Sequence, residues 1–469
     1  MPVMPRGDLE NQSANRIARG AFAAFIIYSA GVGLAYCSQL VIARFLAVDA
    51  YGVYAYVMAW VTVLAYFSAL GFDIALLRFL PAYEAESAWP LFRGVIQYAE
   101  RRALAVGILI ILAGAYIVLV RDISTQLRDT FLVGLFLVPV LALLWIRSSV
   151  VRAFGGVLWA VAPNRVVREG IVIGLVSLAS VGLGWSLDAS RVMMATLAGA
   201  VVGLLLATLG MHKLRPHVID SASPEYDAEV WRRAALPLVI MAAIEALLNR
   251  TGVILLGWFG DTNAAGIYSL AFNIAFVVAL PLVAINTLFA PTISGLFARN
   301  EQVTLQKLIT KAATWTLAAS SFIGVALFVL AAELFAWFGP GYEAGVPALR
   351  ILLIAQVIVA AGGSQLHVMM MTGHERSAAV LLVSSTIGNL VASAGLIGAF
   401  GLNGAAIGTA ATLIIWNLAM ALFLWRRLGL MAGVLAFFQV GLARTGWLLA
   451  RAPPPLRRAL GRLRHSFRF

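Results

Sequence analysis

Long apolar stretches dominate the sequence and most constrain its fold. A helix needs about 20 consecutive, mostly apolar residues to cross a membrane. Lipid offers backbone groups no hydrogen-bond partners, and these runs are too long and too continuously apolar for barrel strands, so each is expected to be helical. The expected spans are 20–43, 52–73, 95–119, 130–153, 165–184, 192–211, 234–257, 265–290, 313–335, 349–371, 378–398 and 405–425. The predicted fold class is an all-α polytopic membrane protein with about 12 transmembrane helices.

The composition agrees with a membrane location. Apolar residues make up 62% of the chain and charged residues 12%. A soluble domain of this length could not bury so much apolar surface. The polar segment 1–19 is followed by an apolar run longer than that of a signal peptide, so we expect no cleaved signal. The single cysteine, Cys37, excludes an internal disulfide.

The distribution of basic residues predicts the topology. The net charge of +13 would also suit a nucleic-acid-binding protein. With the N-terminus placed in the cytoplasm, however, about 28 of the 34 Lys and Arg residues fall on cytoplasmic loops, tails or nearby span ends. This positive-inside bias predicts that both termini are cytoplasmic, and it explains the basic charge without nucleic acid. Five arginines fall at the outer side: Arg44, Arg121, Arg128, Arg191 and Arg350.

A repeated phrase indicates that the chain is doubled. The segment 45–54 (FLAVDAYGVY) recurs 214 residues later as 259–268 (FGDTNAAGIY), with Phe, Ala, Gly and Tyr in the same register. Each half would hold six spans, an even number, so the halves must share one orientation. They would be two parallel six-helix bundles related by a pseudo-two-fold axis along the membrane normal, with a cavity between them. Duplication of this kind is typical of transporters.

The expected organisation has five parts. They are a cytoplasmic N-terminal tail (1–19), an N-terminal six-helix bundle (20–212), a cytoplasmic linker (213–233), a C-terminal six-helix bundle (234–428) and a basic tail (429–469). Near the end of the basic tail, apolar residues recur at helical spacing between arginines. This pattern predicts an amphipathic helix on the anionic membrane surface, with a solvated tail as the alternative. The apolar stretch 430–449 either spans the membrane or lies on it.

No enzyme motif, metal-ligand spacing or nucleotide-binding motif was found, so the chain is predicted to be a transporter without a cofactor rather than an enzyme. Ionisable residues inside spans are then the default functional candidates. Arg250 lies deepest, and Asn249 and Glu245 lie on the same helix. A guanidinium there is suited to a phosphate. A structural pair with a neighbouring helix is the alternative. Glu245 and Arg250 lie about 140° apart on a helix, which disfavours an ion pair between them.

Further candidates lie near the span ends. Arg44 either lines the outer mouth or snorkels to the interface. Asp73 and Arg78 bracket the inner end of the second span, where they either gate the entrance or form a local ion pair. Arg147, Arg152 and Arg165 crowd the inner ends of spans four and five. They would form a cationic rim that attracts a lipid diphosphate, or they simply set the topology.

Short motifs occur in order along both halves. The first half holds ARFL (43–46), YGVY (51–54) and GFDIALLRFLPAY (71–83). The second half holds LPL (236–238), AGIY (265–268), PTIS (291–294), MTGHE (371–375) and NGAA (403–406). In their order and spacing over about residues 15–428, these motifs resemble bacterial polysaccharide flippases of the multidrug/oligosaccharidyl-lipid/polysaccharide exporter superfamily.

The resemblance implies a fold like that of multidrug and toxin exporters and a cationic cavity working by alternating access. It implies a flippase for undecaprenyl-diphosphate-linked oligosaccharide in the bacterial inner membrane, working beside a polysaccharide polymerase and glycosyltransferases. Arg250, and less surely Arg44 and Arg78, are the matching cavity positions. Proton or sodium coupling is expected from relatives, and Glu245 and Asp73 are the candidate coupling or gating groups.

Three alternatives remain open at this point. A multidrug exporter of the same fold would favour deep acidic residues. A membrane glycosyltransferase or polymerase would need a large outer loop, and none is large enough. A membrane component of a synthesis complex without transport activity is the third.

Overall fold

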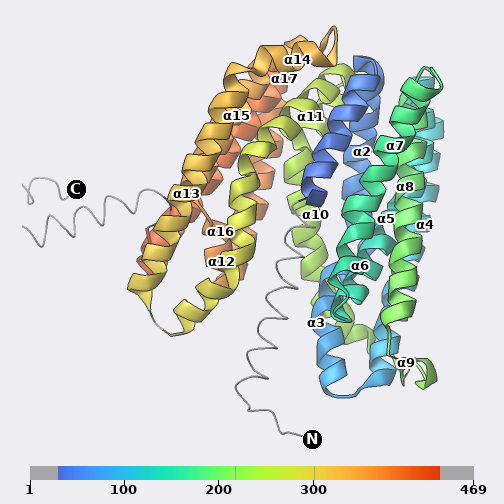
Figure 1. Cartoon of the computed structure of the whole chain (residues 1–469), viewed down its shortest axis with the longest axis vertical. Coiled ribbons are helices and arrows are strands. Elements are labelled where there is room, and N and C mark those ends of the chain that lie inside the picture. The colour runs from blue at the N-terminus through green and yellow to red at the C-terminus, as the bar shows by residue number, and fades with distance from the viewer. Residues whose placement is uncertain (1–29, 217, 300, 432, 434–469) are drawn as a thin grey trace, which may run out of the picture. The chain divides into compact units, whose positions relative to one another are not determined.

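Helices joined by short turns and loops form the described chain (Figure 1). The structure is a computed structural model that describes residues 30–216, 218–299, 301–431 and 433, and these ranges contain no strand. An apolar helix over Ala30–Phe45 comes first. The later elements are α2 (Val48–Ala69), α3 (Phe72–Ala85), α4 (Trp89–Val120), α5 (Thr125–Ala153), α6 (Val157–Ala162), the π-helical turn η1 (Pro163–Val167), α7 (Arg168–Ser177), the π-helical turn η2 (Leu178–Gly182), α8 (Ala189–Leu214), α9 (Val218–Ser221), α10 (Ala228–Trp258), α11 (Thr262–Phe276), the 3-10 turn η3 (Val277–Ala279), α12 (Leu280–Ala298), α13 (Gln302–Val329), α14 (Ala331–Phe338), the 3-10 turn η4 (Tyr342–Gly345), α15 (Val346–Gly362), α16 (Gln365–Met371) and α17 (Glu375–Leu428).

Every expected span overlaps a helix. Nine helical stretches of the described chain are long and apolar enough to cross a membrane, and Ala30–Phe45 is a shorter apolar helix. The fifth expected span corresponds to the stretch from α6 to η2. Within it, the π-helical turn η1 separates α6 from α7, and the π-helical turn η2 follows α7. The last two spans both lie in α17. Gly401 adopts φ 53° and ψ −129° and breaks this helix between them. The prediction of an all-α polytopic membrane fold is confirmed.

Side-chain caps fix where several of these helices begin. Ser124 accepts a hydrogen bond from the Leu127 N–H at the start of α5, at 3.3 Å. Asp188, Asp227 and Asp261 cap α8, α10 and α11 in the same way. Each cap satisfies a backbone N–H that the helix itself leaves without a partner, which is worth about 1 kcal/mol.

The chain divides into two compact units. The first comprises Met1–Val277, Ala326–Leu353 and Leu382–Thr412, and the second comprises Val278–Val325, Ile354–Leu381 and Leu413–Phe469. In the first unit α5 packs against α2, α4 and α8, while α10 and α11 pack against α2 (Figure 1). The second unit has its own apolar cluster, which includes Ile293, Leu305, Val368 and Leu424. The expected division at the linker 213–233 remains a prediction.

The two copies of the repeated phrase contact each other in the first unit, where α2 meets α11. The contact is made by the glycine of each copy. A Cβ atom built on Gly266 would lie 2.5 Å from the Cα of Gly52, and one on Gly52 would collide with the carbonyl of Thr262. Neither position has room for a side chain. The phrase is therefore more than a turn between helices, because its glycines let two helices approach closely.

The tyrosines of the two copies make the same hydrogen bond. The hydroxyl of Tyr54 bonds with that of Thr196 on α8 at 3.3 Å. The hydroxyl of Tyr268 bonds with that of Thr409 on α17 at 2.8 Å. Thr196 and Thr409 lie in the expected sixth span of their own half. The internal repeat is thus a repeat of contacts as well as of sequence.

The segment expected to link the halves is packed against α3 and α4. Trp231 is fully buried, and its Nε1 donates a hydrogen bond to the Tyr83 hydroxyl at 2.9 Å. Arg93 donates to the Ala222 carbonyl at 2.8 Å, and the Glu225 N–H donates to the Pro90 carbonyl at 3.0 Å. The start of α10 is therefore anchored to the first half. The N-terminal tail 1–19 and most of the basic tail 429–469, including the choice between a span and a surface helix for 430–449, lie outside the described residues.

Candidate functional site

Helix α10 carries the deepest of the predicted site residues. Glu245 and Asn249 are exposed on it, and Arg250 is partly buried. The Asn249 amide donates a hydrogen bond to the Glu245 carbonyl at 3.0 Å. The side chains of Glu245 and Arg250 form no ion pair or hydrogen bond with the described residues, in agreement with their expected separation around the helix. An exposed carboxylate and a guanidinium without a partner in a membrane helix indicate a surface that faces water or ligand rather than lipid.

Tyr66 on α2 brings four of the predicted residues together. Its hydroxyl lies within electrostatic range of Asp73, Glu245, Arg165 and Arg250. These side chains come from α3, α10 and η1, so charged groups of both signs from three elements lie within electrostatic range of one phenol. We call Tyr66 and these four residues the Tyr66 cluster. Sequence reasoning had placed the four charged residues in three separate groups.

An aromatic side chain extends the Tyr66 cluster. The rings of Tyr66 and Trp145 on α5 lie 4.5 Å apart between centroids, with 36° between their planes. Both residues are partly exposed. The Tyr66 hydroxyl has no hydrogen bond with the described residues. The site therefore combines an aromatic surface with groups of both charges.

Asp73 lies in the first turn of α3, two residues after Gly71, whose φ of 74° interrupts the helix between α2 and α3. The backbone carbonyl of Asp73 accepts a hydrogen bond from the Ser149 hydroxyl. One carboxylate oxygen, Oδ1, is buried without a hydrogen-bond partner among the described residues. A buried acceptor without a donor is costly, so this oxygen is ready to accept a hydrogen bond from a ligand or a water.

The three arginines of the expected cationic rim, Arg147, Arg152 and Arg165, lie in different environments. Arg147 is compensated by Glu100, with an N–O distance of 2.7 Å, and also donates to the Thr208 hydroxyl. Arg152 is exposed, as is Arg78 on α3. Arg165 is packed closely against the first helix, where a Cβ on Gly31 would lie 2.5 Å from its own Cβ. Of the rim, the structure places only Arg165 in the Tyr66 cluster.

Arg44 lies away from that cluster, at the end of helix 30–45. Its guanidinium lies over the ring of Trp337 on α14, 5.4 Å from the centroid. The residue that matches Arg44 in the second half, Trp258, receives Arg121 over its ring at 5.0 Å. Both are cation–π contacts, so the Arg44 guanidinium is stabilised by the Trp337 ring.

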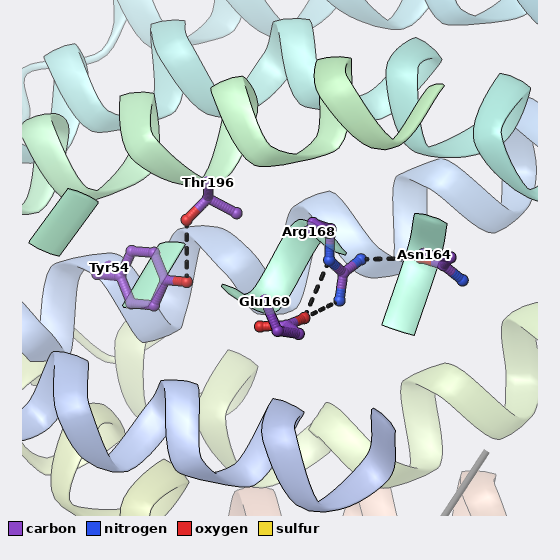
Figure 2. A network of polar contacts seen from close by, with 5 residues as sticks. All are labelled: Tyr54, Asn164, Arg168, Glu169 and Thr196. Atoms are coloured by element: carbon purple, nitrogen blue, oxygen red, sulfur yellow. Dashed lines mark hydrogen bonds and ion pairs between the residues drawn. The ribbon is translucent and has the colours of Figure 1, made fainter. Parts of the chain in front are cut away.

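Sequence reasoning missed a buried ion pair at the start of α7, shown in Figure 2. Arg168 Nε donates to Glu169 at 2.9 Å, and Arg168 Nη1 donates to the Asn164 side-chain oxygen at 3.3 Å. Glu169 is only 6% exposed. Both charges act on the Tyr54 hydroxyl, which bonds with Thr196 in the same view. The available signal was the adjacent Arg-Glu within the expected span 165–184.

Comparisons with known proteins give a family and a fold. Residues 17–297 match the profile of a family described as polysaccharide biosynthesis protein. A multidrug resistance MATE family transporter of the MOP superfamily, in an inward-facing conformation, is 14% identical, with a TM-score of 0.70 over 88% of this chain and 97% of that one. The lipid II flippase MurJ, in an inward closed conformation, is 13% identical, with a TM-score of 0.67 over 87% of each chain.

A MOP superfamily transporter from Pyrococcus furiosus is also similar, at 16% identity and a TM-score of 0.59 over 86% of this chain and 95% of that one. No curated protein matches the chain. At these identities the structural likeness shows the fold alone. The expected exporter-like fold is confirmed, and the chain is a multi-pass membrane protein.

Proposed function

Because the chain belongs to the polysaccharide biosynthesis protein family, whose profile covers residues 17–297, we propose that it is a lipid-linked oligosaccharide flippase. It moves undecaprenyl-diphosphate-linked repeat units across the bacterial inner membrane by alternating access. The units serve a surface polysaccharide, which is an O-antigen, a capsule or an exopolysaccharide. The termini are cytoplasmic, in line with the positive-inside bias.

Arg250 is the observation that carries this proposal. It is a permanently charged group in a membrane helix, partly exposed and without an ion pair among the described residues. Such a charge is expensive in a membrane unless it serves an anion. A diphosphate supplies that anion and accepts the paired N–H groups of a guanidinium in two parallel hydrogen bonds. Arg165, in the same Tyr66 cluster, adds a second positive charge.

The substrate's chemistry explains why a protein is needed. A diphosphate carrying sugars cannot cross hydrocarbon unaided, because burying unpaired charge is prohibitive. Arginines in a wet pathway lower that barrier, while the polyprenyl chain stays in lipid. The lipid II flippase with this fold supports transport of a lipid-linked substrate.

The test is export of a surface polysaccharide from cells whose own copy of the gene is deleted. Arg250→Ala is expected to abolish export while the protein still inserts in the membrane, and Arg250→Lys to retain part of it. The matched control is Arg101→Ala, an exposed arginine on α4 that belongs neither to the Tyr66 cluster nor to the predicted rim. Normal export by a well-expressed Arg250→Ala protein would remove Arg250 from the mechanism.

A multidrug exporter is the second candidate, favoured by the exposed carboxylate of Glu245. In that case Glu245→Gln would abolish resistance to cationic drugs, and Arg250→Ala would leave resistance intact. A role in a synthesis complex without transport predicts that the Arg250 variants export normally. Protons or sodium ions would supply the driving force, with Glu245 and Asp73 as the coupling candidates.

A further inference from the structure

We propose that Tyr66 and Trp145 form a sugar subsite. The sugar attached directly to the diphosphate stacks on this aromatic pair, and Asp73 and Glu245 accept hydrogen bonds from its hydroxyl groups. The inference rests on the proposed function and names the part of the substrate that this site recognises.

The aromatic pair is built as an accessible surface rather than as core. Tyr66 and Trp145 lie 4.5 Å apart with planes 36° apart, and both are partly exposed. A core pair in the same unit looks different: Tyr51 and Tyr342 lie 6.1 Å apart and are 0% and 1% exposed. Ring area left open beside charged groups is available to a flat apolar face, such as the C–H face of a pyranose ring.

Polar groups without partners lie within electrostatic range of Tyr66. The Tyr66 hydroxyl and the Glu245 carboxylate have no side-chain hydrogen bond with the described residues. Asp73 Oδ1 is buried and has none either. Two of these groups are pure acceptors when ionised and one both donates and accepts. A pyranose satisfies both features, because it has an apolar face for the rings and hydroxyl groups for the carboxylates.

A ligand that uses groups of both charges fits this site best. A cationic aromatic drug would stack on the rings and pair with the carboxylates, but it would leave Arg250, which acts on the same Tyr66 hydroxyl, without an anion. A sugar bonded to a diphosphate has neutral hydroxyls and an anion side by side. The guanidinium groups then hold the diphosphate, and the adjacent ring reaches Tyr66 and Trp145.

The experiment compares two probes bound to the full chain in lipid nanodiscs. The first is a polyprenyl diphosphate, and the second is the same lipid carrying one hexose. For the wild type we expect the hexose to lower Kd about tenfold, the size of one ring stacked on an aromatic side chain. In Trp145→Ala the two probes should bind equally, with the Kd of the bare lipid within about twofold of wild type.

Two further variants guard against misfolding and general effects of losing tryptophan. Trp145→Phe keeps a ring at the site and should retain part of the gain from the hexose. Trp185→Ala removes a tryptophan that is 60% exposed in the loop before α8, and it should keep the full gain. Arg250→Ala should weaken both probes by the same factor, since it acts on the diphosphate.

The outcomes separate this inference from the proposed function. If the bare lipid binds and the hexose adds nothing in the wild type, the sugar subsite is wrong and the flippase proposal stands. If the hexose gain survives in Trp145→Ala, the sugar lies elsewhere and the inference is again overturned. If a cationic dye binds in a Trp145-dependent way and neither lipid binds, both proposals fail.

Discussion

The buried ion pair at the start of α7 predicts a large and specific stability effect. Glu169→Gln keeps the shape of the side chain but removes its charge, leaving Arg168 with two neutral partners. The Arg168 and Glu169 side chains are 19% and 8% exposed. Breaking such a buried pair by removing one charge costs about 3–5 kcal/mol. Because Arg168 retains some exposure, we expect about 3 kcal/mol, the lower end of that range.

The chain offers a matched comparison at the start of α10. Arg233 and Glu229 also form an ion pair, but their side chains are 79% and 65% exposed. Exposed pairs are worth about 0–1 kcal/mol, so Glu229→Gln should change stability by less than 1 kcal/mol. The free energy of unfolding would be measured by titrating the protein in mixed micelles with a denaturing detergent, following the loss of tertiary fluorescence.

A double variant separates stability from transport. Replacing both charges by apolar side chains of similar size, Arg168→Met with Glu169→Leu, should recover most of the lost stability, because no buried charge is left unpaired. If this variant also exports polysaccharide, the ion pair is structural. The reasoning is refuted if Glu169→Gln destabilises the protein no more than Glu229→Gln does.

Two more predictions concern packing. Gly266→Ala should separate α2 from α11 and cost about 1–3 kcal/mol, because its Cβ would lie 2.5 Å from the Cα of Gly52. Gly174→Ala, on α7 with no atom within 4 Å of the new Cβ, should be neutral or slightly stabilising in the same titration; equal losses would contradict the contact. Trp231→Ala should cost about 3–5 kcal/mol, since this buried side chain holds the start of α10, and thermal unfolding in detergent measures it. A loss below 1 kcal/mol would show that the anchor is dispensable.

The helices could be predicted from the sequence because they depend on local properties. Span length, apolar runs and capping residues such as Asp188 are read from a few adjacent positions. The break at Gly401 and the π-helical turn that contains Asn164 depend on which neighbours the chain meets. The apolar pattern therefore predicted the spans but could not show where a span bends.

The candidate site was only partly predictable for the same reason. Arg250 was found because a charge deep in a span is visible in the sequence. Tyr66 and Trp145 were two of several span aromatics whose rings suit a sugar face, and nothing local indicates that these two contact each other. The burial of Arg168 and Glu169 could not be predicted, because it depends on which helices pack against the start of α7 and not on the adjacent residues.

The two arginine–tryptophan contacts make the two halves of the chain chemically different. The first half supplies both cations, Arg44 and Arg121, and the second half supplies both rings, Trp337 and Trp258. The residue of the first half that matches Trp258 is Arg44, so the two halves are not interchangeable at these contacts. A second copy of either half in place of the other would lose both contacts, because each contact needs a cation from the first half and a ring from the second.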